Sequence, residues 1–269
     1  MTRKVFVILF ILFFAGLICG TLFDLRISQM LYDPESLAGN VVNYMAMTPS
    51  AIMLMYCSGV VVWYCRNHRF RYVVATVIIN FIGSILVFGE IGEWAHLSLK
   101  MWLPLALVAS LLVLLMFQII KPNVTKDMFV LAMTFMITIV AVMLTVEGLK
   151  YLFGRPRFYS LTDPATQFVP WYLPHPFASS DYFKSFPSGH TAFASLTVFL
   201  IYLPDMLKKN WNWKLFIFAY LLWTGFVMYG RICYGAHFLS DVSAGALIAL
   251  CICYYAHKIV EKHTDFDKI

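Results

Sequence analysis

The stretch "VFVILFILFFAGLICGTLF", residues 5–23, follows Arg3 and Lys4 and contains no charged residue. A helix needs roughly 20 apolar residues to cross the hydrocarbon layer of a bilayer, and this stretch meets that length. No A-x-A cleavage site follows it, and Ile18 precedes Cys19 where a lipoprotein signal needs a small residue. We therefore predict that the stretch is retained as a first membrane helix.

The composition extends this interpretation to the whole chain. Of the 269 residues, 61% are hydrophobic and 13% are charged, and the mean hydropathy is +0.76. A soluble domain of this length needs far more polar surface. We predict an all-α, polytopic transmembrane helical bundle that forms one integral membrane domain over residues 1–269. About eight spans are expected, near 4–24, 44–65, 72–92, 101–120, 127–149, 189–206, 214–230 and 239–257.

Basic residues between these spans predict the orientation, because cytoplasmic loops are enriched in Lys and Arg. With the N-terminus in the cytoplasm, 13 of the 20 basic residues fall on the cytoplasmic side: Arg3, Lys4, Arg66, Arg69, Arg71, Lys121, Lys126, Lys208, Lys209, Lys214, Lys258, Lys262 and Lys268. We interpret the basic loop at 66–71 as a topology signal that touches lipid headgroups, and we expect no nucleic-acid partner. The chain is expected in an inner or plasma membrane.

Three polar motifs stand at the outer ends of the predicted spans. They are "KYLFGRPRF" at 150–158, "PSGH" at 187–190 and "GRICYGAHFLSD" at 230–241. Lys150, Arg157 and Arg231 place three cations at one membrane face, where isolated charges are costly. The outer acids are too few and too scattered to balance them. A phosphate group would do so, because Arg binds its oxygens as a fork and Lys adds a point charge.

The second motif predicts an anion-binding helix start with a histidine beside it. Ser188 and Gly189 open a predicted helix, so that their backbone N–H groups and the helix dipole would face an anion. Gly189 would let the anion approach the backbone closely. His190 follows directly.

The third motif supplies a second histidine with a carboxylate. His237 and Asp241 are four residues apart on one helix face, where the carboxylate can accept Nδ1–H and leave Nε2 as a nucleophile or base. With His190 from another helix, the pair suits in-line displacement at phosphorus, in which one histidine attacks and the other protonates the leaving oxygen. Two alternatives are a metal site and buried structural histidines. Three nearby cations would repel a divalent metal, so we expect no metal and no cofactor.

The three motifs together resemble the signature of the type-2 phosphatidic-acid phosphatase family, which shares its site with vanadium haloperoxidases. That signature reads K-x6-R-P, P-S-G-H and S-R-x5-H-x3-D. The resemblance covers residues 127–257, the expected phosphatase-like core. The chain departs from the signature at Phe158, where the family has Pro, and at Gly230, where it usually has Ser. The family core needs six helices, so either two of the expected spans are additions or the count of eight is too high.

The resemblance implies a role for each matching residue. His237 would be the nucleophile that forms a phosphohistidine, Asp241 its orienting partner and His190 the general acid. The implied phosphate-binding residues are Lys150, Arg157, Ser188, Gly189 and Arg231. The implied enzyme is a metal-independent phosphatase that acts on a lipid phosphomonoester or an isoprenoid pyrophosphate at the outer membrane face, with the surrounding membrane lipids as its other partners.

Several alternatives stay open at this point. The same motifs would serve a phosphotransferase that passes the phosphoryl group to another lipid, and a non-catalytic protein could bind anionic lipid. Arg155 could bind a second phosphate or be an interfacial cation, and Glu147 is expected to pair with Lys150. The aromatic and proline-rich loop at 158–187 could be a lid or a connector. The sequence leaves the lipid substrate and the oligomeric state open.

Overall fold

The structure is a computed structural model of the chain, and it describes residues 1–66, 70–175, 180–206 and 210–264. Across these ranges the chain is about 80% helical and has no strand, which confirms the all-α prediction. Six basic residues of the predicted cytoplasmic side fall outside what is described, four entirely and two by their side chains: Arg69, Lys208, Lys209 and Lys268, and then Arg71 and Lys262.

Seven segments of the described chain are long and apolar enough to cross a membrane, which confirms a polytopic bundle. They are Arg3–Leu31, Leu37–Cys65, Val73–Trp94, Leu99–Ile120, Lys126–Ser160, Trp213–Cys233 and Leu239–Val260. The remaining expected span, 189–206, is divided among α8 (Gly189–Ser195), the 3-10 helix η3 (Leu196–Tyr202) and α9 (Leu203–Met206). Its apolar helical part, Gly189–Tyr202, is shorter than the other seven.

The chain divides into two compact units. The first comprises residues 1–46, 140–201 and 212–254, and the second comprises 47–139, 202–211 and 255–269. The first unit contains α1 (Arg3–Leu31), α2 (Leu37–Met45), the later part of α6 (Lys126–Phe153), α7 (Pro164–Gln167), α8, α10 (Trp213–Cys233) and the earlier part of α11 (Leu239–Thr264). All three polar motifs lie in this first unit.

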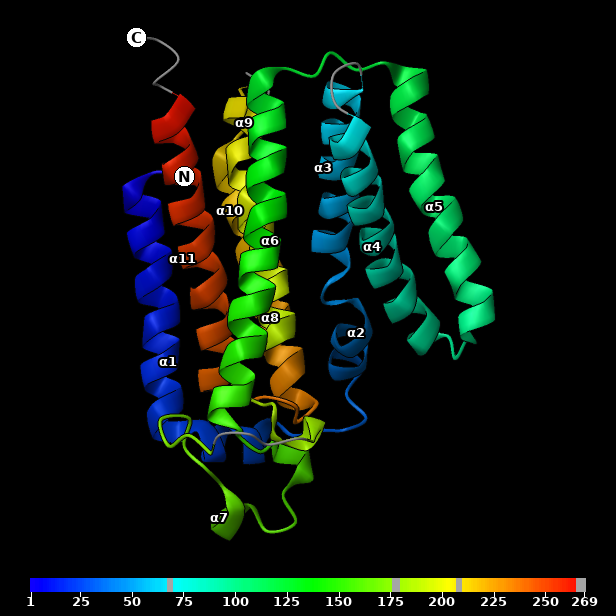
Figure 1. The fold of residues 1–269 in the computed structure, drawn as a ribbon. Helices are drawn as coiled ribbons and strands as arrows, with labels where there is room; N and C mark the ends of the chain where they lie inside the picture. The colour runs from blue at the N-terminus through cyan, green and yellow to red at the C-terminus, as the bar shows by residue number, and fades with distance from the viewer. Residues whose placement is uncertain (67–69, 176–179, 207–209, 265–269) are drawn as a thin grey trace. The chain divides into compact units, whose positions relative to one another are not determined.

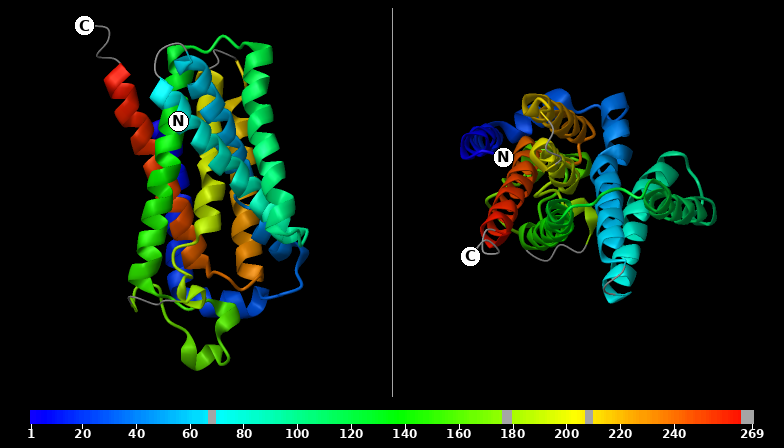
Figure 2. Two further views of the ribbon diagram at one scale, coloured as in Figure 1. Left: turned by 45° about the vertical axis from the view of Figure 1, so that its right-hand side comes forward. Right: turned by 90° about the horizontal axis from the view of Figure 1, so that it is seen from above.

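Within the first unit, α1 packs along α11 (Figures 1 and 2). Small residues allow this close approach, since a Cβ added at Gly20 would overlap the backbone nitrogen of Ser240. Farther along the same pair of helices, the rings of Phe6 and Tyr254 stack with centroids 4.0 Å apart. The packing therefore holds the N-terminal helix against the helix that begins beside His237.

The glycine at position 230 has a packing reason. Helix α2 lies against α10, and a Cβ at Gly230 would stand 2.7 Å from the carbonyl oxygen of Ala38 and 2.8 Å from a methyl group of Val42. A serine side chain would therefore not fit here unless α2 moved. The contact brings α2 beside the third motif.

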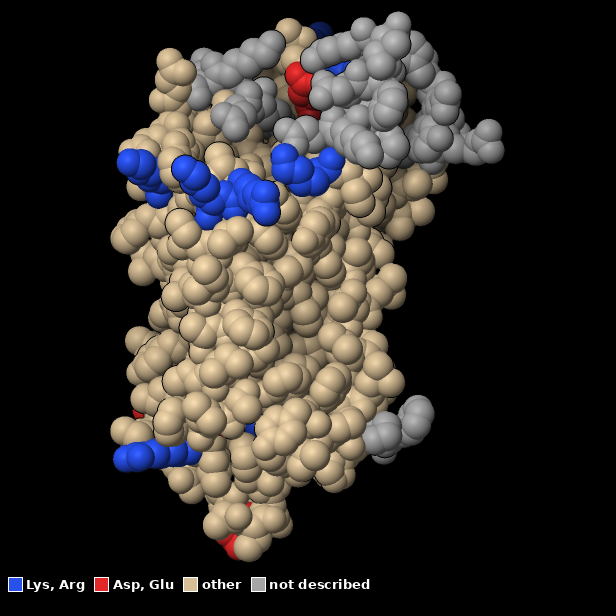
Figure 3. Space-filling view, turned by 90° about the vertical axis from the view of Figure 1, so that its left-hand side faces the viewer, with Lys and Arg blue, Asp and Glu red and all other residues tan. Residues whose placement is uncertain are grey.

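The α1 helix has the charge pattern of a membrane span. No charged residue stands between Lys4 and Asp24, and the side chains of Ile8, Ile11 and Leu22 are exposed. Figure 3, which faces the α1 side of Figure 1, shows Lys and Arg side chains near the two ends of a wide uncharged surface. An apolar helix surface bounded by polar ends is what a bilayer requires.

The second unit contains α3 (Thr48–Cys65), α4 (Phe70–Trp94) and α5 (Leu99–Ile120), which lie side by side in Figure 1. A neutral polar cluster joins them. Asn80 Nδ2 donates to the Met55 carbonyl at 2.9 Å and to Ser58 Oγ at 2.7 Å, and Asn80 Oδ1 accepts from Ser110 Oγ at 2.6 Å. Hydrogen bonds between buried polar groups of this kind help hold apolar helices together.

The described part of the loop that follows α6 is anchored at several points. Trp171 Nε1 donates to Thr21 Oγ1 on α1 at 2.9 Å, and the Trp171 ring stacks on Phe186 with centroids 5.2 Å apart. The backbone of His175 donates to the carbonyl of Phe153 at 2.8 Å. These contacts favour a fixed connector over a lid.

Candidate active site

His237 lies in the turn between α10 and α11 and is only 1% exposed. Its Nδ1 is 2.6 Å from the backbone carbonyl oxygen of Ser185. Because a carbonyl can only accept, Nδ1 carries the proton and Nε2 keeps a free lone pair. The expected tautomer is therefore supported, but its partner differs from the expected one. The Asp241 carboxylate lies 3.9 Å from Nδ1, beyond hydrogen-bond distance.

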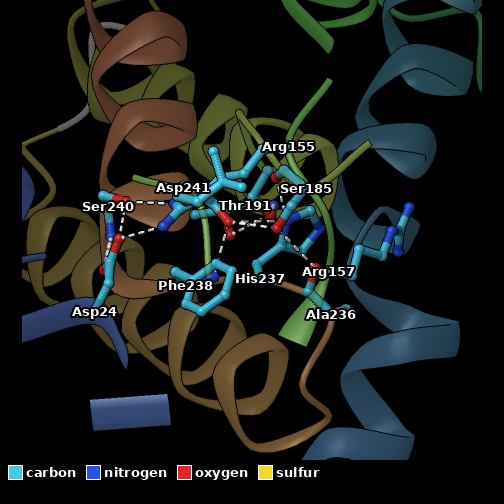
Figure 4. A network of polar contacts seen from close by, with 12 residues as sticks. Asp24, Arg155, Arg157, Ser185, Thr191, Ala236, His237, Phe238, Ser240 and Asp241 are labelled. Carbon is cyan, nitrogen blue, oxygen red and sulfur yellow. Dashed lines mark hydrogen bonds and ion pairs between the residues drawn. The ribbon is translucent and has the colours of Figure 1, made fainter. Parts of the chain in front are cut away.

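Asp241 instead accepts from three other groups (Figure 4). Its Oδ2 accepts from Ser185 Oγ at 2.6 Å and from the Phe238 backbone N–H at 2.8 Å, and its Oδ1 accepts from Arg155 at 2.5 Å. Ser185 therefore contacts both members of the pair, His237 through its carbonyl and Asp241 through its hydroxyl. The sequence analysis missed Ser185, whose only signal is its place just before the second motif.

The second motif lies against the third. The Ser188 backbone N–H donates to the Asp241 carbonyl at 3.0 Å, so it is not free to bind an anion as expected. Its Oγ caps α8 by accepting from the Thr191 N–H at 3.4 Å. Gly189 follows as the first helical residue, and a Cβ there would stand 3.1 Å from Lys150 Nζ. The glycine thus lets the Lys150 ammonium lie close to the start of α8.

The three predicted phosphate-binding cations differ in their partners. Lys150 Nζ pairs with Glu147 at 2.6 Å, as expected, and Arg157 pairs with Asp181 at 3.0 Å. Acidic residues on the predicted outer side therefore form ion pairs with two of the three cations. This is contrary to the expectation that these acids are too few and too scattered in the sequence to balance the cations. Both acids are substantially exposed, Glu147 by 43% and Asp181 by 70%.

Arg231 is the third cation, and its environment is different. It is 1% exposed and donates to the Asn43 side-chain oxygen at 2.5 Å, while its Nε has no hydrogen-bond partner. Among the described residues, no carboxylate pairs with it. Asn43 lies on α2, outside the three motifs, and its backbone carbonyl also contacts the His190 ring. The sequence carried no signal for Asn43.

The two histidines and the three cations converge. Burial, followed by the charges of Arg231, Arg157, His190 and Lys150, lowers the pKa of His237 well below its usual value. Burial and the same three cations, Arg231 first, also lower the pKa of His190. The structure thus brings the three motifs to one place, with His237 uncharged at neutral pH.

The structure corrects both expectations for Arg155, that it binds a second phosphate or that it is an interfacial cation. It is 1% exposed, so it is not an interfacial cation, and its guanidinium is already paired with two carboxylates. These are Asp24 at 2.9 Å and Asp241 at 2.5 Å. Asp24 comes from α1 and was also missed, although an acid inside an apolar membrane helix is itself a signal of function.

Comparison with known proteins gives a family for the chain. A family model described as the PAP2 superfamily matches residues 129–265, which is half of the chain and includes all three motifs. No curated protein and no solved structure gives a significant match. The resemblance expected from the motifs is confirmed, and with it an activity of the phosphatase type on phosphoric esters. The chain belongs to the PAP2 superfamily.

Proposed function

We propose that the protein is a membrane phosphatase that removes phosphate from a lipid phosphate or lipid pyrophosphate, without a metal and through a phosphohistidine. The observation that carries the proposal is the buried Arg231, which has no acidic partner in the described chain and an unsatisfied Nε, in the same site as the uncharged His237. A buried cation of this kind is stabilised when an anion binds. A phosphoryl group is the anion that suits both residues.

The substrate phosphate would be bound by cations from three elements. Arg231 would donate Nε and a terminal nitrogen to two phosphate oxygens, which is the geometry that Arg prefers. Lys150 and Arg157 would add charge from α6 and the segment after it. Their present partners, Glu147 and Asp181, are exposed, so releasing them costs little.

In the first step, His237 Nε2 attacks phosphorus and forms a P–N bond while the P–O bond to the lipid breaks. The leaving oxygen takes a proton from His190. The negative charge of the bound phosphate would raise the pKa of His190 and favour the protonated form that this step needs. His237 gains positive charge as the bond forms, and its Nδ1 keeps its proton, which is hydrogen-bonded to the Ser185 carbonyl.

In the second step, water attacks the phosphohistidine. Neutral His190 takes a proton from the water, the P–N bond breaks, and inorganic phosphate leaves with His237 uncharged again. His190 then carries the proton for the next turnover. The balance needs only water as co-reactant.

The residue contacts support a reaction without a metal. Both oxygens of Asp241 are engaged by Arg155, Ser185 and the Phe238 backbone, so this carboxylate has little capacity to coordinate a cation. Three positive side chains can stabilise the charge on the transferring phosphoryl group in place of a metal.

The site is proposed to face the outside of the cell. Arg231 stands in the last turn of α10, and Trp213 begins this helix at its other end. The basic residues between the spans assign the Trp213 end to the cytoplasm. The enzyme would then act on lipid headgroups of the outer leaflet.

A phosphate-release panel on the purified protein tests the reaction. The substrates are phosphatidic acid, phosphatidylglycerol phosphate, undecaprenyl pyrophosphate and lipid A phosphate, each with excess EDTA and with vanadate. We expect free phosphate in EDTA and inhibition by vanadate, which mimics five-coordinate phosphorus. Transfer to a second lipid would identify a phosphotransferase, and binding without turnover a non-catalytic protein. Loss in EDTA that magnesium or zinc restores would overturn the metal-free reaction.

Cysteine labelling tests the membrane face. The exposed Ala165, in the loop after α6, and the exposed Asn210, just before α10, are each changed to Cys in a background without the six native cysteines. An impermeant thiol reagent should label Ala165→Cys in intact cells and should label Asn210→Cys only after lysis. The reverse pattern would place the site in the cytoplasm.

A further inference from the structure

A buried charge cluster of three residues lies next to His237 (Figure 4). Arg155 donates through Nη2 to Asp24 at 2.9 Å and through Nη1 to Asp241 at 2.5 Å. Each of the three side chains is at most 3% exposed. The cluster joins α1, the segment after α6, and the start of α11, so its members come from three distant parts of the chain.

The hydrogen bonds define the charges of the cluster. Asp24 accepts from the Ser240 backbone N–H at 2.9 Å and from the Ser240 hydroxyl, in addition to Arg155. Arg155 and the backbone N–H groups of Ser240 and Phe238 can only donate to these carboxylates, which favours their ionised forms. Two carboxylates and one guanidinium leave the cluster with a net charge of −1.

That net charge depends on Asp24. Without Asp24, the positive charge of Arg155 would cancel the negative charge of Asp241. The remaining pair would then have almost no electrostatic effect on His237. Asp241 contacts Ser185, whose carbonyl accepts a hydrogen bond from Nδ1–H of His237. The Arg155 guanidinium also lies 4.0 Å from the centre of the Phe238 ring, the residue directly after His237. Two sets of contacts therefore connect the cluster to His237: Asp241 through Ser185, and Arg155 through the neighbouring Phe238.

We propose that Asp24 is a positioning residue of the reaction, which acts through Arg155 to keep Asp241 in place and to keep a net negative charge beside His237. The inference rests on the proposed function of His237 as nucleophile. The charge would stabilise the positive imidazole that forms on attack. Asp24 lies outside residues 129–265, the part matched by the family model, so this contribution comes from the N-terminal helix of this chain.

The alternative is that the cluster only ties α1 to α11. Apolar side chains or small residues would do this without the desolvation cost of three buried charges, as Gly16 and Gly20 already do along the same helix pair. The two roles differ in one measurable respect. A structural tie affects the amount and stability of the protein, whereas a charge beside His237 affects the pH at which His237 becomes protonated.

The sign of this effect follows from the charges that face His237. These are Arg231 on α10, Arg157 after α6, His190 on α8 and Lys150 on α6, with Asp241 on α11. The cations favour the neutral imidazole, and the negative cluster opposes them. Removing negative charge therefore moves protonation of His237 to lower pH, and removing the Arg155 charge moves it to higher pH.

The test compares three charge states of the cluster. Asp24→Asn makes it neutral, Arg155→Gln makes it −2, and the double variant returns it to −1. Two readouts are followed against pH: kcat/KM for phosphatidic acid in detergent micelles, and the rate at which diethyl pyrocarbonate modifies neutral His237, measured by peptide mass spectrometry. The second readout needs no turnover, so absence of phosphatase activity in the unaltered protein counts against the proposed function alone.

We expect Asp24→Asn to shift the acidic limb to lower pH by about 0.5 unit or more and to lower kcat about tenfold. Arg155→Gln should shift the limb upward, and the double variant should return it toward that of the unaltered protein. Thr21→Ala is the matched control, because Thr21 lies one turn away on α1 and contacts Trp171 but not the cluster. It should leave the limb in place.

An unchanged limb in both single variants would overturn the proposal, as would a double variant shifted as far as Asp24→Asn. The position of the limb is independent of how much protein folds, so reduced yield does not obscure the result. If Asp24→Asn does not fold, the upward shift of Arg155→Gln decides alone, and its absence overturns the proposal.

Discussion

Arg155 and Arg231 are equally buried, each 1% exposed, yet they have opposite surroundings. Arg155 lies between two carboxylates, Asp24 and Asp241. Arg231 has the neutral amide of Asn43 and an Nε without a partner. The first arginine is satisfied by the fold, and the second has hydrogen-bonding capacity and charge that the described chain does not satisfy.

This difference separates a residue that builds the site from a residue that is proposed to bind the ligand. A buried charge is costly unless it is paired, so an arginine with two carboxylates is a permanent part of the structure. An arginine without one is stabilised by whatever anion enters. Sequence position did not distinguish the two, because both stand at the outer ends of predicted spans.

The largest effect is expected where the anion reacts. Changing His237 to Ala removes the proposed nucleophile and should lower phosphate release at least about 1,000-fold, while vanadate should still bind at Arg231. Phosphate release and vanadate binding are measured on protein that elutes as a single species in detergent. Residual activity within tenfold of the unaltered protein would contradict the role of His237.

The next effect tests the two arginines directly. Arg231→Met should lower kcat/KM about 100-fold and weaken vanadate binding, since one of the phosphate donors is lost. It should not lower the melting temperature, because it removes a buried charge without an acidic partner. Both quantities are measured on the same preparation.

Arg155→Met is the matched comparison. It leaves two buried carboxylates unpaired and should destabilise the protein by about 3–5 kcal/mol. A thermal shift in Arg231→Met as large as that in Arg155→Met would erase the distinction between the two arginines.

Asn43→Asp would make the surroundings of Arg231 resemble those of Arg155. The new carboxylate would pair with the guanidinium and compete with phosphate, so KM should rise about tenfold, equal to about 1.4 kcal/mol, while the melting temperature rises. Asn43→Ser is the control for the loss of the amide. If KM in Asn43→Asp equals that in Asn43→Ser, competition for Arg231 is not the cause.

The smallest effect concerns pH. In the proposed reaction His237 attacks in its neutral form, and its pKa is lowered first by burial and then by Arg231, so the acidic limb of kcat/KM should lie below pH 6.5, the ordinary value for histidine. In Arg231→Met this limb should move to higher pH, because a positive charge is removed. A limb at or above pH 6.5 in the unaltered protein would contradict the charge of Arg231 beside His237.

The sequence alone determined the helical membrane class and indicated the candidate residues for the chemistry. Apolar runs of spanning length leave few structural choices in a bilayer, because every backbone polar group must be satisfied within a helix or a closed barrel. The fixed spacings within "PSGH" and within the stretch from Arg231 to Asp241 are local, so they could be recognised without knowing how the helices pack.

Only the tertiary structure determined which side chain each buried arginine contacts. Asp24 and Arg155 are 131 positions apart, and Asn43 and Arg231 are 188 positions apart. Such contacts depend on how α1 and α2 pack, through glycines at 20 and 230, against α11 and α10. The spacing of four predicted one helix face for His237 and Asp241, but His237 lies in the turn before α11, so the spacing does not determine which group lies nearest to Nδ1. The Ser185 carbonyl accepts the hydrogen bond from Nδ1–H, because a hydrogen bond forms with the acceptor that packing brings within reach.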